Sequence, residues 1–335
     1  MLRVGIIGSG FGRIGLLPAF NGIKGAKVSA VCAKKIHRMR GKHSRNLFLN
    51  SQEFRNSNIN IYDDWRMMLE MEELDAVAVA VPPKVQYEIA KTAIAKGLHV
   101  FAEKPLAANL AQARELFALA KRKGIVTGID FIFPEIAEWK KVKELLDKKA
   151  FGELKHISVN WNWLSGDIRY GRSTWKTSVK EGGGALSFYF SHGLYYLENF
   201  AGKIVGTKTL FSYSPKSLNG GEVGFDMLVR FKSGATGDVH VSCNTPGIFR
   251  HRLMFICERG VITLENKNAI VDNFTVKVQG NEGEKIVKVK KDQGRKQEDE
   301  RVKIVRKLAK RFVYACIHRK QMRPSFADGL RVQEL

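Results

Sequence analysis

Short apolar runs alternate with helical segments through residues 1–128, and this alternation constrains the fold more than any other feature of the sequence. Strands separated by helices imply right-handed crossovers and a parallel sheet. The sequence therefore predicts a doubly wound α/β domain over 1–128. The strands are expected at 2–8, 26–33, 74–82, 98–102 and 124–129, and the helices at 12–22, 34–47, 63–71, 84–96 and 109–123.

After about residue 130 the pattern changes. A helix at 134–149 leads into ELKHISVNWNW (153–163), where polar and apolar residues alternate as in an antiparallel strand. We expect a second domain, 129–335, of α+β class with a large, mostly antiparallel open sheet. Trp161 and Trp163 should share one face, in sheet packing or a subunit interface. The remaining strands are expected at 204–213, 222–232, 235–244, 252–258, 261–265 and 274–290, and a basic helix at 297–319.

Composition argues against several classes of protein. The 335 residues contain no apolar stretch long enough for a membrane helix, and the N-terminus lacks the pattern of a signal peptide, so we expect a cytoplasmic protein. The four cysteines, at positions 32, 243, 257 and 316, lie far apart. This spacing favours neither a disulfide framework nor a structural zinc site, and no metal is expected.

The net charge of +23 implies an anionic partner. Basic residues gather at 34–45 and again at 285–323. No zinc-finger, RNP or basic-zipper pattern accompanies the second cluster, so a solvated helix face is favoured and nucleic acid is not expected as a partner. Steeply salt-dependent retention on DNA would indicate otherwise.

The stretch VGIIGSGFGRIG (4–15) places Gly8, Gly10 and Gly12 between the first strand and the first helix. Glycine permits the tight turn, and at Gly10 it lets a pyrophosphate approach the backbone at the helix N-terminus. The spacing is GxGxG, with Arg13 where a third small residue is usual. At the first turn of an α/β domain this pattern predicts a dinucleotide site that also includes Phe11.

The end of the second strand predicts which dinucleotide is bound. An acid there accepts a hydrogen bond from the ribose of NAD, whereas its absence beside basic residues favours the 2′-phosphate of NADP. This sequence has Ala33 in that place, followed by Lys34 and Lys35. NADP(H) is therefore favoured over NAD(H).

The strand at 98–102 runs directly into Glu103, Lys104 and Pro105. A charged pair at the end of a buried strand is costly unless it is paired or used. The carboxyl ends of parallel strands form the crevice where ligands bind. Lys104 is therefore expected beside the nicotinamide.

These features resemble the Gfo/Idh/MocA (glucose–fructose oxidoreductase / inositol dehydrogenase) family over nearly the whole chain. The resemblance implies a Rossmann domain, an open-sheet C-terminal domain and an active site between them. It also implies hydride exchange between a nicotinamide and a hydroxyl or keto carbon, usually of a sugar, polyol or nucleotide sugar. The matching motifs are GSGFG (8–12), VPP (81–83), EKPLAANLAQARELFALAKRKG (103–124), GGGALSFYFSHGLYYL (182–197) and PSFADGLRVQEL (324–335).

The resemblance also assigns roles to particular residues. Lys104 contacts substrate and cofactor, and His192 is the acid/base, which suits an imidazole because carbinol oxidation releases a proton. Val81, Pro82 and Glu103 join the cofactor site. Because STWKT (173–177) precedes the GGG run, Trp175 and Lys176 are expected in the substrate wall, Trp175 as a face for a sugar ring and Lys176 as a donor; the alternative is ordinary packing and surface charge. A homo-oligomer, dimer or tetramer, is expected through the C-terminal sheet.

The departures from the family pattern concern the acid/base. Phe188 stands where many members have an aspartate one turn before the histidine, Tyr195 replaces a second aspartate, and Phe190 replaces a glycine. Phe188, His192 and Tyr195 are expected on one stripe of a single helix, which also includes Asn199. Tyr189, Tyr195 or Lys176 then assists His192, or Lys104 is the main acid/base. The alternative is a non-catalytic cofactor- or sugar-binding sensor on the same scaffold.

Overall fold

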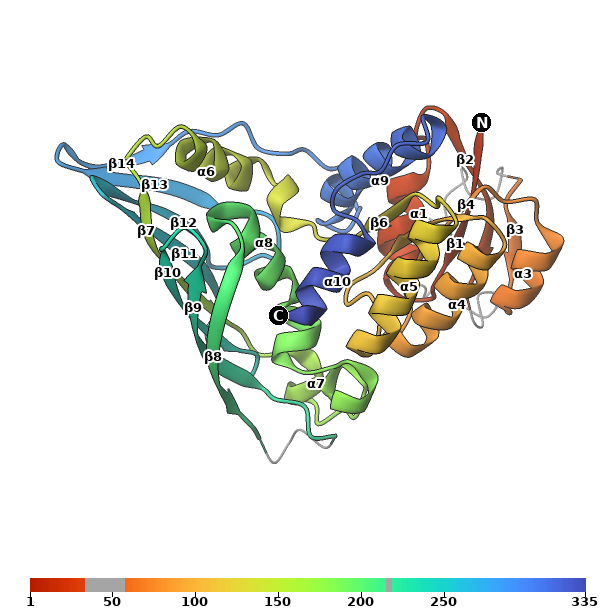
Figure 1. Cartoon of the computed structure of the whole chain (residues 1–335), viewed down its shortest axis with the longest axis horizontal. Helices are drawn as coiled ribbons and strands as arrows, with labels where there is room; N and C mark the ends of the chain where they lie inside the picture. The colour runs from red at the N-terminus through yellow and green to blue at the C-terminus, as the bar shows by residue number, and fades with distance from the viewer. Residues whose placement is uncertain (34–57, 215–218) are drawn as a thin grey trace. The chain divides into compact units, whose positions relative to one another are not determined.

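The computed structural model describes residues 1–33, 58–214 and 219–335 (Figure 1). The chain divides into two compact units. Unit 1 contains Met1–Ile132 and Gln293–Glu334, and unit 2 contains Phe133–Asp292. The sequence suggested one boundary, with domains 1–128 and 129–335, whereas the structure returns the C-terminal segment to unit 1.

Six strands form the parallel sheet of unit 1, in the order β3-β2-β1-β4-β5-β6. This order confirms the doubly wound fold, and its reversal between β1 and β4 marks the position where such sheets bind ligands. The predicted strands are present, and one more, β3, was not predicted. The strands are β1 (Leu2–Ile7), β2 (Ala26–Cys32), β3 (Asn60–Tyr62), β4 (Ala76–Val79), β5 (His99–Ala102) and β6 (Thr127–Ile129).

The helices of unit 1 pack against this sheet and against one another. In Figure 1, α4 (Pro83–Ala95) and α5 (Leu110–Arg122) lie side by side, and α10 (Phe326–Glu334) contacts α5. The first helix is a π-helical turn, η1 (Gly12–Leu16), continued by α1 (Leu17–Phe20). A shorter helix, α3 (Trp65–Met71), follows β3 and begins at the capping carboxylate of Asp64.

The predicted basic helix is α9 (Val302–Ile317), and it explains why the C-terminal segment belongs to unit 1. Its apolar residues recur at helical spacing and are buried against α1 and η1. Phe312 of α9 joins Phe20 and Phe101 in a cluster of edge-on rings with centroids 5.5 to 6.2 Å apart. Its lysines and arginines are half-buried or exposed, and Tyr314 and Ile317 are exposed as well.

Unit 2 is built on an eight-stranded sheet in the order β14-β13-β12-β11-β7-β10-β9-β8. Among its described strands only β7 and β10 pair in parallel, so the sheet is mostly antiparallel, as predicted. The predicted strand 274–290 is a hairpin of two strands. The strands are β7 (Leu154–Asn162), β8 (Ile204–Ser212), β9 (Gly224–Phe231), β10 (Thr236–Ser242), β11 (Arg250–Cys257), β12 (Gly260–Asn266), β13 (Thr275–Gly280) and β14 (Gly283–Val287).

The helices of unit 2 lie on one side of this sheet in Figure 1. They are α6 (Ala137–Asp147), α7 (Gly166–Arg169) and α8 (Ser191–Ala201), with short 3₁₀ turns η3 (Phe133–Glu135), η4 (Trp175–Thr177) and η5 (Val179–Glu181) and a π-helical turn η6 (Ala185–Tyr189). Trp161 and Trp163 share one face as predicted, with ring centroids 4.9 Å apart. Trp161 also stacks on buried His251, which identifies its role as sheet packing.

Two further predictions concern the chain as a whole. All four cysteines are buried, unbridged thiols, as the spacing suggested. Among the residues that the structure describes, no helix has both the length and the apolar character needed to cross a membrane.

Candidate functional site

The residues that follow the strands of unit 1 line up along one edge of its sheet. Each first residue after a strand donates its backbone N–H to the last carbonyl of the neighbouring strand. The distances are 2.8 to 3.0 Å for Gly8 to Cys32, Ala33 to Tyr62, Ala80 to Ile7, Glu103 to Val79 and Asp130 to Ala102. The glycine-rich turn, the end of β2 and the Glu103–Lys104 pair therefore belong to one edge.

The glycine-rich turn fits a dinucleotide. Gly8 has φ 141°, and a Cβ there would lie 2.2 Å from the carbonyl oxygen of Ala80, so the turn excludes any side chain. Above Gly10, in contrast, a Cβ would meet no atom of the described residues within 4 Å. This open space at the start of η1, where helical N–H groups point outward, suits the pyrophosphate of NAD(P). Phe11 and Gly12 complete the turn.

The structure describes some of the other predicted cofactor residues but not all of them. Ala33 is buried, with 2% of its surface exposed, so no carboxylate occupies the end of β2 at this position. Lys34 and Lys35 lie outside the described residues. Val81 and Pro82 are half-buried just after β4, where Pro82 precedes the first turn of α4.

The turn that carries Lys104 is held by a side chain that sequence reasoning missed. Gln86 of α4 is only 1% exposed. Its Nε2 donates to the carbonyl oxygens of Glu103 (2.6 Å), Pro105 (3.0 Å) and Leu106 (3.2 Å). Its Oε1 accepts the backbone N–H of Glu103 at 3.2 Å. One buried amide therefore fixes the backbone on both sides of Lys104, whose side chain is half-buried.

A cluster of charged groups surrounds this turn within unit 1. Asp130, after β6, is 2% exposed and hydrogen-bonded to Glu103. Burial, together with the neighbouring Glu103 carboxylate, raises the pKa of Asp130 well above its usual range. Arg301 pairs with Asp299 through two contacts of 2.8 Å, and its guanidinium lies 4.3 Å over the Phe11 ring. The carboxyl-end rule could have pointed to Asp130, but no sequence signal pointed to Gln86 or Arg301.

In unit 2, the GGG segment brings two elements close together. Gly184 has φ 106°, and a Cβ there would lie 2.3 Å from the Glu222 carboxylate oxygens. That carboxylate accepts the backbone N–H of Leu186 at 2.9 Å, at the start of η6. Burial raises the pKa of Glu222. Glu222, which sequence reasoning also missed, thus anchors the turn that leads to His192.

His192 lies in the first turn of α8 and is 9% exposed. Its ring meets that of Phe133 edge-on at 5.1 Å. Phe133 also contacts His251, whose pKa burial lowers to about 3. His192 therefore belongs to an aromatic cluster in which its neighbour His251 is neutral.

The single helical stripe predicted through Phe188, His192 and Tyr195 is interrupted. Phe188 belongs to the π-helical turn η6, and α8 begins only at Ser191. The Phe188 ring contacts Trp175 at 4.8 Å and Tyr189 at 4.4 Å, whereas His192 packs on Phe133. A π-turn has a wider repeat than an α-helix, so the expected α-helical spacing does not hold across it.

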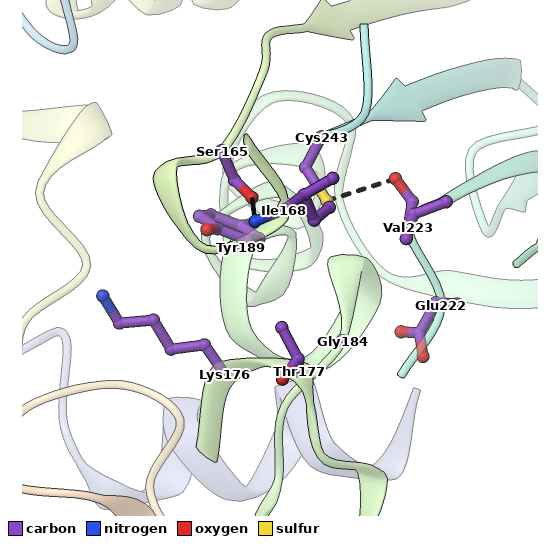
Figure 2. A pocket seen from close by; sticks show the side chains of 9 residues that line it. All are labelled: Ser165, Ile168, Lys176, Thr177, Gly184, Tyr189, Glu222, Val223 and Cys243. Atoms are coloured by element: carbon purple, nitrogen blue, oxygen red, sulfur yellow. Dashed lines mark hydrogen bonds between the residues drawn. The ribbon is translucent and has the colours of Figure 1, made fainter. Parts of the chain in front are cut away.

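Trp175 and Lys176, which were predicted to form part of the substrate wall, both contact the Phe188 ring. Lys176 Nζ lies 5.3 Å over the Phe188 ring, beside Trp175. Lys176 and Tyr189 also line one small pocket (Figure 2), with free space of about 10 Å³, which is room for about one water molecule. Burial is the main cause that raises the pKa of Tyr189, so its hydroxyl stays protonated. The pocket is lined by Ser165, Ile168, Lys176, Thr177, Gly184, Tyr189, Glu222, Val223 and Cys243.

Figure 2 shows the Lys176 side chain extending away from Glu222. Trp175, His192 and Tyr195 are not among the described residues that line this pocket. The structure thus groups Lys176, Tyr189 and Trp175 around Phe188, and places His192 in the neighbouring aromatic cluster. Tyr195, in α8, is half-buried.

Two family models match this chain. Residues 2–131 match the oxidoreductase family with an NAD-binding Rossmann fold, and residues 139–263 match the GFO/IDH/MocA C-terminal domain. Both halves of the chain thus match models that share one family name.

Among curated relatives, an uncharacterized oxidoreductase of Synechocystis is 33% identical over 198 residues, 58% of this chain and 50% of the relative. A dTDP-3,4-didehydro-2,6-dideoxy-alpha-D-glucose 3-reductase of Actinomadura kijaniata is 34% identical over 122 residues, 36% of this chain and 35% of the relative. The match therefore spans half or less of each relative's length.

Among solved structures, levoglucosan dehydrogenase in complex with NADH and levoglucosan superposes with a TM-score of 0.82. The match covers 99% of this chain and 94% of the other, at 19% identity. At this identity the likeness establishes the shared fold.

Proposed function

The chain belongs to the Gfo/Idh/MocA oxidoreductase family, and from this premise we propose that it transfers a hydride between NAD(P) and a hydroxyl or keto carbon of a sugar, polyol or nucleotide sugar. One observation carries the proposal: the turn bearing Lys104 is fixed by buried Gln86 on the same sheet edge as the open space over Gly10. A lysine held at this edge can contact a bound dinucleotide. Without such a ligand, fixing its charge there would serve no function.

The chain's own residues would orient the substrate and move a proton. When bound, the nicotinamide supplies or accepts the hydride. The Lys104 ammonium donates a hydrogen bond to the reacting oxygen of the sugar, which stabilises the negative charge that develops there. His192 takes the hydroxyl proton in oxidation and returns it in reduction. Two electrons and one proton leave the substrate as hydride, and the second proton leaves through the imidazole.

The residues around Phe188 supply the assisting groups. Tyr189 keeps its hydroxyl proton, because burial raises its pKa, and can act as a donor. Lys176 and Trp175 flank the Phe188 ring and would contact hydroxyls and a sugar face. If His192 proves dispensable, Lys104 is the main acid/base.

NADP(H) is proposed as the preferred cofactor. Ala33 leaves the end of β2 without a carboxylate, and Lys34 and Lys35 follow it in the sequence. A charge-assisted phosphate contact contributes about 1.5–3 kcal/mol, or roughly 10- to 100-fold in affinity. Titration of both cofactors tests this preference, and equal or tighter NAD(H) binding would refute it.

The relatives support a carbohydrate substrate. The Actinomadura relative is by its name a reductase of a dTDP-linked sugar, and levoglucosan dehydrogenase was solved with a sugar derivative. Neither name describes a regulator, so the sensor alternative has no support from them.

We also propose a cytoplasmic homo-oligomer. The four buried thiols suit a reducing compartment. Leu210 of β8 and Leu228 of β9 are 77% and 62% exposed on the sheet of unit 2, a surface suited to a second copy. Light scattering should give a dimer or tetramer, and Leu228→Glu should shift it toward monomer. A wild-type monomer would refute the oligomer.

The experiment that tests the function is a substrate panel. Purified protein with NADPH or NADH is offered keto sugars and nucleotide-linked keto sugars, and with the oxidised cofactors it is offered the matching alcohols. The absorbance of reduced nicotinamide should change with at least one compound. Cofactor binding without turnover on any of them would favour the sensor alternative.

A further inference from the structure

Two carboxyl-bearing residues are neighbours at the end of the strand that carries Lys104: Glu103 and Asp130 directly follow the paired strand ends Ala102 and Ile129, and Asp130 donates its backbone N–H to the Ala102 carbonyl oxygen at 3.0 Å. Asp130 is 2% exposed, and it is hydrogen-bonded to Glu103. Its Oδ1 has no hydrogen-bond partner among the described residues. An ionised carboxylate only accepts hydrogen bonds, so a bond between two carboxyl groups requires one proton on one of them.

The charged groups around Glu103 and Asp130 favour one bound proton on this carboxyl pair over none. Glu103 and Lys104 follow β5, Asp130 follows β6, and Arg301 precedes α9 with Asp299 as its partner. Among the described groups of this cluster, a pair that holds one proton has a single negative charge, which with that of Asp299 stands against the positive charges of Arg301 and Lys104. Without that proton Asp130, only 2% exposed, would carry or adjoin an additional negative charge, which burial makes costly.

Glu103 connects this pair to the lysine. Its Oε2 accepts the backbone N–H of Lys104 at 3.1 Å, while the same carboxyl group is bonded to Asp130. A donor on Asp130 therefore fixes the carboxylate that in turn orients the Lys104 backbone. Gln86 holds the carbonyl oxygens of the same turn.

We propose that Asp130 and Glu103 share one proton at neutral pH, and that Asp130 is thereby a positioning residue for Lys104. With 2% of its surface exposed, Asp130 would act through Glu103 and not by contact with substrate or cofactor. The role in turnover rests on the function proposed above, whereas the shared proton does not.

Infrared spectroscopy of the purified protein tests the proton directly. Near pH 7 the wild type should show the carbonyl band of a protonated carboxylic acid, and Asp130→Asn should lose it. Glu138→Gln is the matched control, because Glu138 is a buried carboxyl of α6 in unit 2, 5% exposed, with its pKa raised by burial. The spectral difference between the wild type and Asp130→Asn should be the same when Glu138→Gln is introduced into both proteins.

Kinetics test the positioning. Asn at position 130 still donates to Glu103, so Asp130→Asn should keep kcat within about threefold, whereas Asp130→Leu should lower kcat at least about tenfold. Affinity for the cofactor should change by less than about threefold in both, since buried Asp130 presents only 2% of its surface to a ligand. Because Asp130→Leu leaves the Glu103 carboxylate without its donor, its Tm should fall below that of Asp130→Asn, and kcat of both variants is therefore measured well below either Tm.

Several results would overturn the proposal. An infrared spectrum in which Asp130→Asn loses no protonated-acid band excludes the shared proton. Full kcat in Asp130→Leu, or an equal loss of kcat in both variants, excludes the positioning role. If the wild type turns over no substrate at all, the proposed function fails, and the infrared comparison alone still decides the shared proton.

Discussion

Replacing Gln86 with leucine should loosen the turn that carries Lys104. The wild-type side chain donates to three carbonyl oxygens, of Glu103, Pro105 and Leu106, and accepts from the Glu103 N–H. An amide nitrogen has only two hydrogens, so these contacts amount to two donated bonds and one accepted bond. At about 1 kcal/mol net for each bond, Gln86→Leu should destabilise the turn by about 3 kcal/mol.

Hydrogen exchange read by mass spectrometry measures this local effect. A loss of about 3 kcal/mol corresponds to roughly a hundredfold faster exchange of the peptide covering 99–106, if the turn opens locally. Turnover should fall at least about tenfold, because misplacing a catalytic group by a fraction of an ångström is costly. Peptides of unit 2 should exchange as in the wild type.

Gln321→Leu is the control for this variant. Gln321 is exposed and makes one bond, from Nε2 to the Ile125 carbonyl oxygen at 2.9 Å. Its loss should cost no more than about 1 kcal/mol and leave the 99–106 peptide unchanged. Unchanged exchange at 99–106 in Gln86→Leu, with turnover within about twofold of wild type, would show that the amide does not hold the turn.

Four further predictions concern substitutions at one or two positions. Lys104→Ala should lower turnover at least about a hundredfold with little change in Tm, because the side chain is half-buried at a strand end; a large drop in Tm would indicate a structural ion pair instead. His192→Asn should reduce kcat about 10²- to 10⁴-fold at unchanged cofactor affinity, and unchanged kcat would refute its acid/base role. Joint replacement of Lys34 and Lys35 by alanine should weaken NADPH binding about 10- to 100-fold and leave NADH binding unaltered, as calorimetry can check. Burial lowers the pKa of His251 from 6.5 to about 3, so the unfolded chain binds a proton that the folded one excludes; stability is lost as pH falls from 6.5 toward 3, and unfolding curves of His251→Phe should show a shallower loss.

The fold was predictable where the burial of an element determines the pattern of apolar residues in that element's own sequence. Strands covered on both faces are continuous apolar runs, as in AVAV of β4, and their separation by helices implies the parallel sheet. The three-residue β3 was missed because Asn60–Tyr62 is short and only half-buried. The amphipathic stripe of α9 was visible, but a stripe does not reveal which surface it covers, so its return to unit 1 was not foreseen.

The candidate site likewise contains residues that the sequence could predict and residues that it could not. Gly8, Gly10 and Lys104 follow closely after strand ends in the sequence, and the sequence pattern predicts where strands end. Gln86 and Arg301 act through contacts with residues distant in the sequence, so only the folded chain reveals them. The π-helical turn before α8 depends on the contact between Gly184 and Glu222, which spans 38 positions of chain and has no local signature.

The most direct test of the proposed function follows the hydride itself. Reduced nicotinamide carrying deuterium at the transferable position is incubated with the protein and a keto sugar accepted in the panel, and the product is analysed by mass spectrometry. The proposed function predicts one deuterium on the carbon that bore the keto group, with the transfer abolished in Lys104→Ala. A product without the label, or label transfer that persists in Lys104→Ala at the wild-type rate, would contradict it.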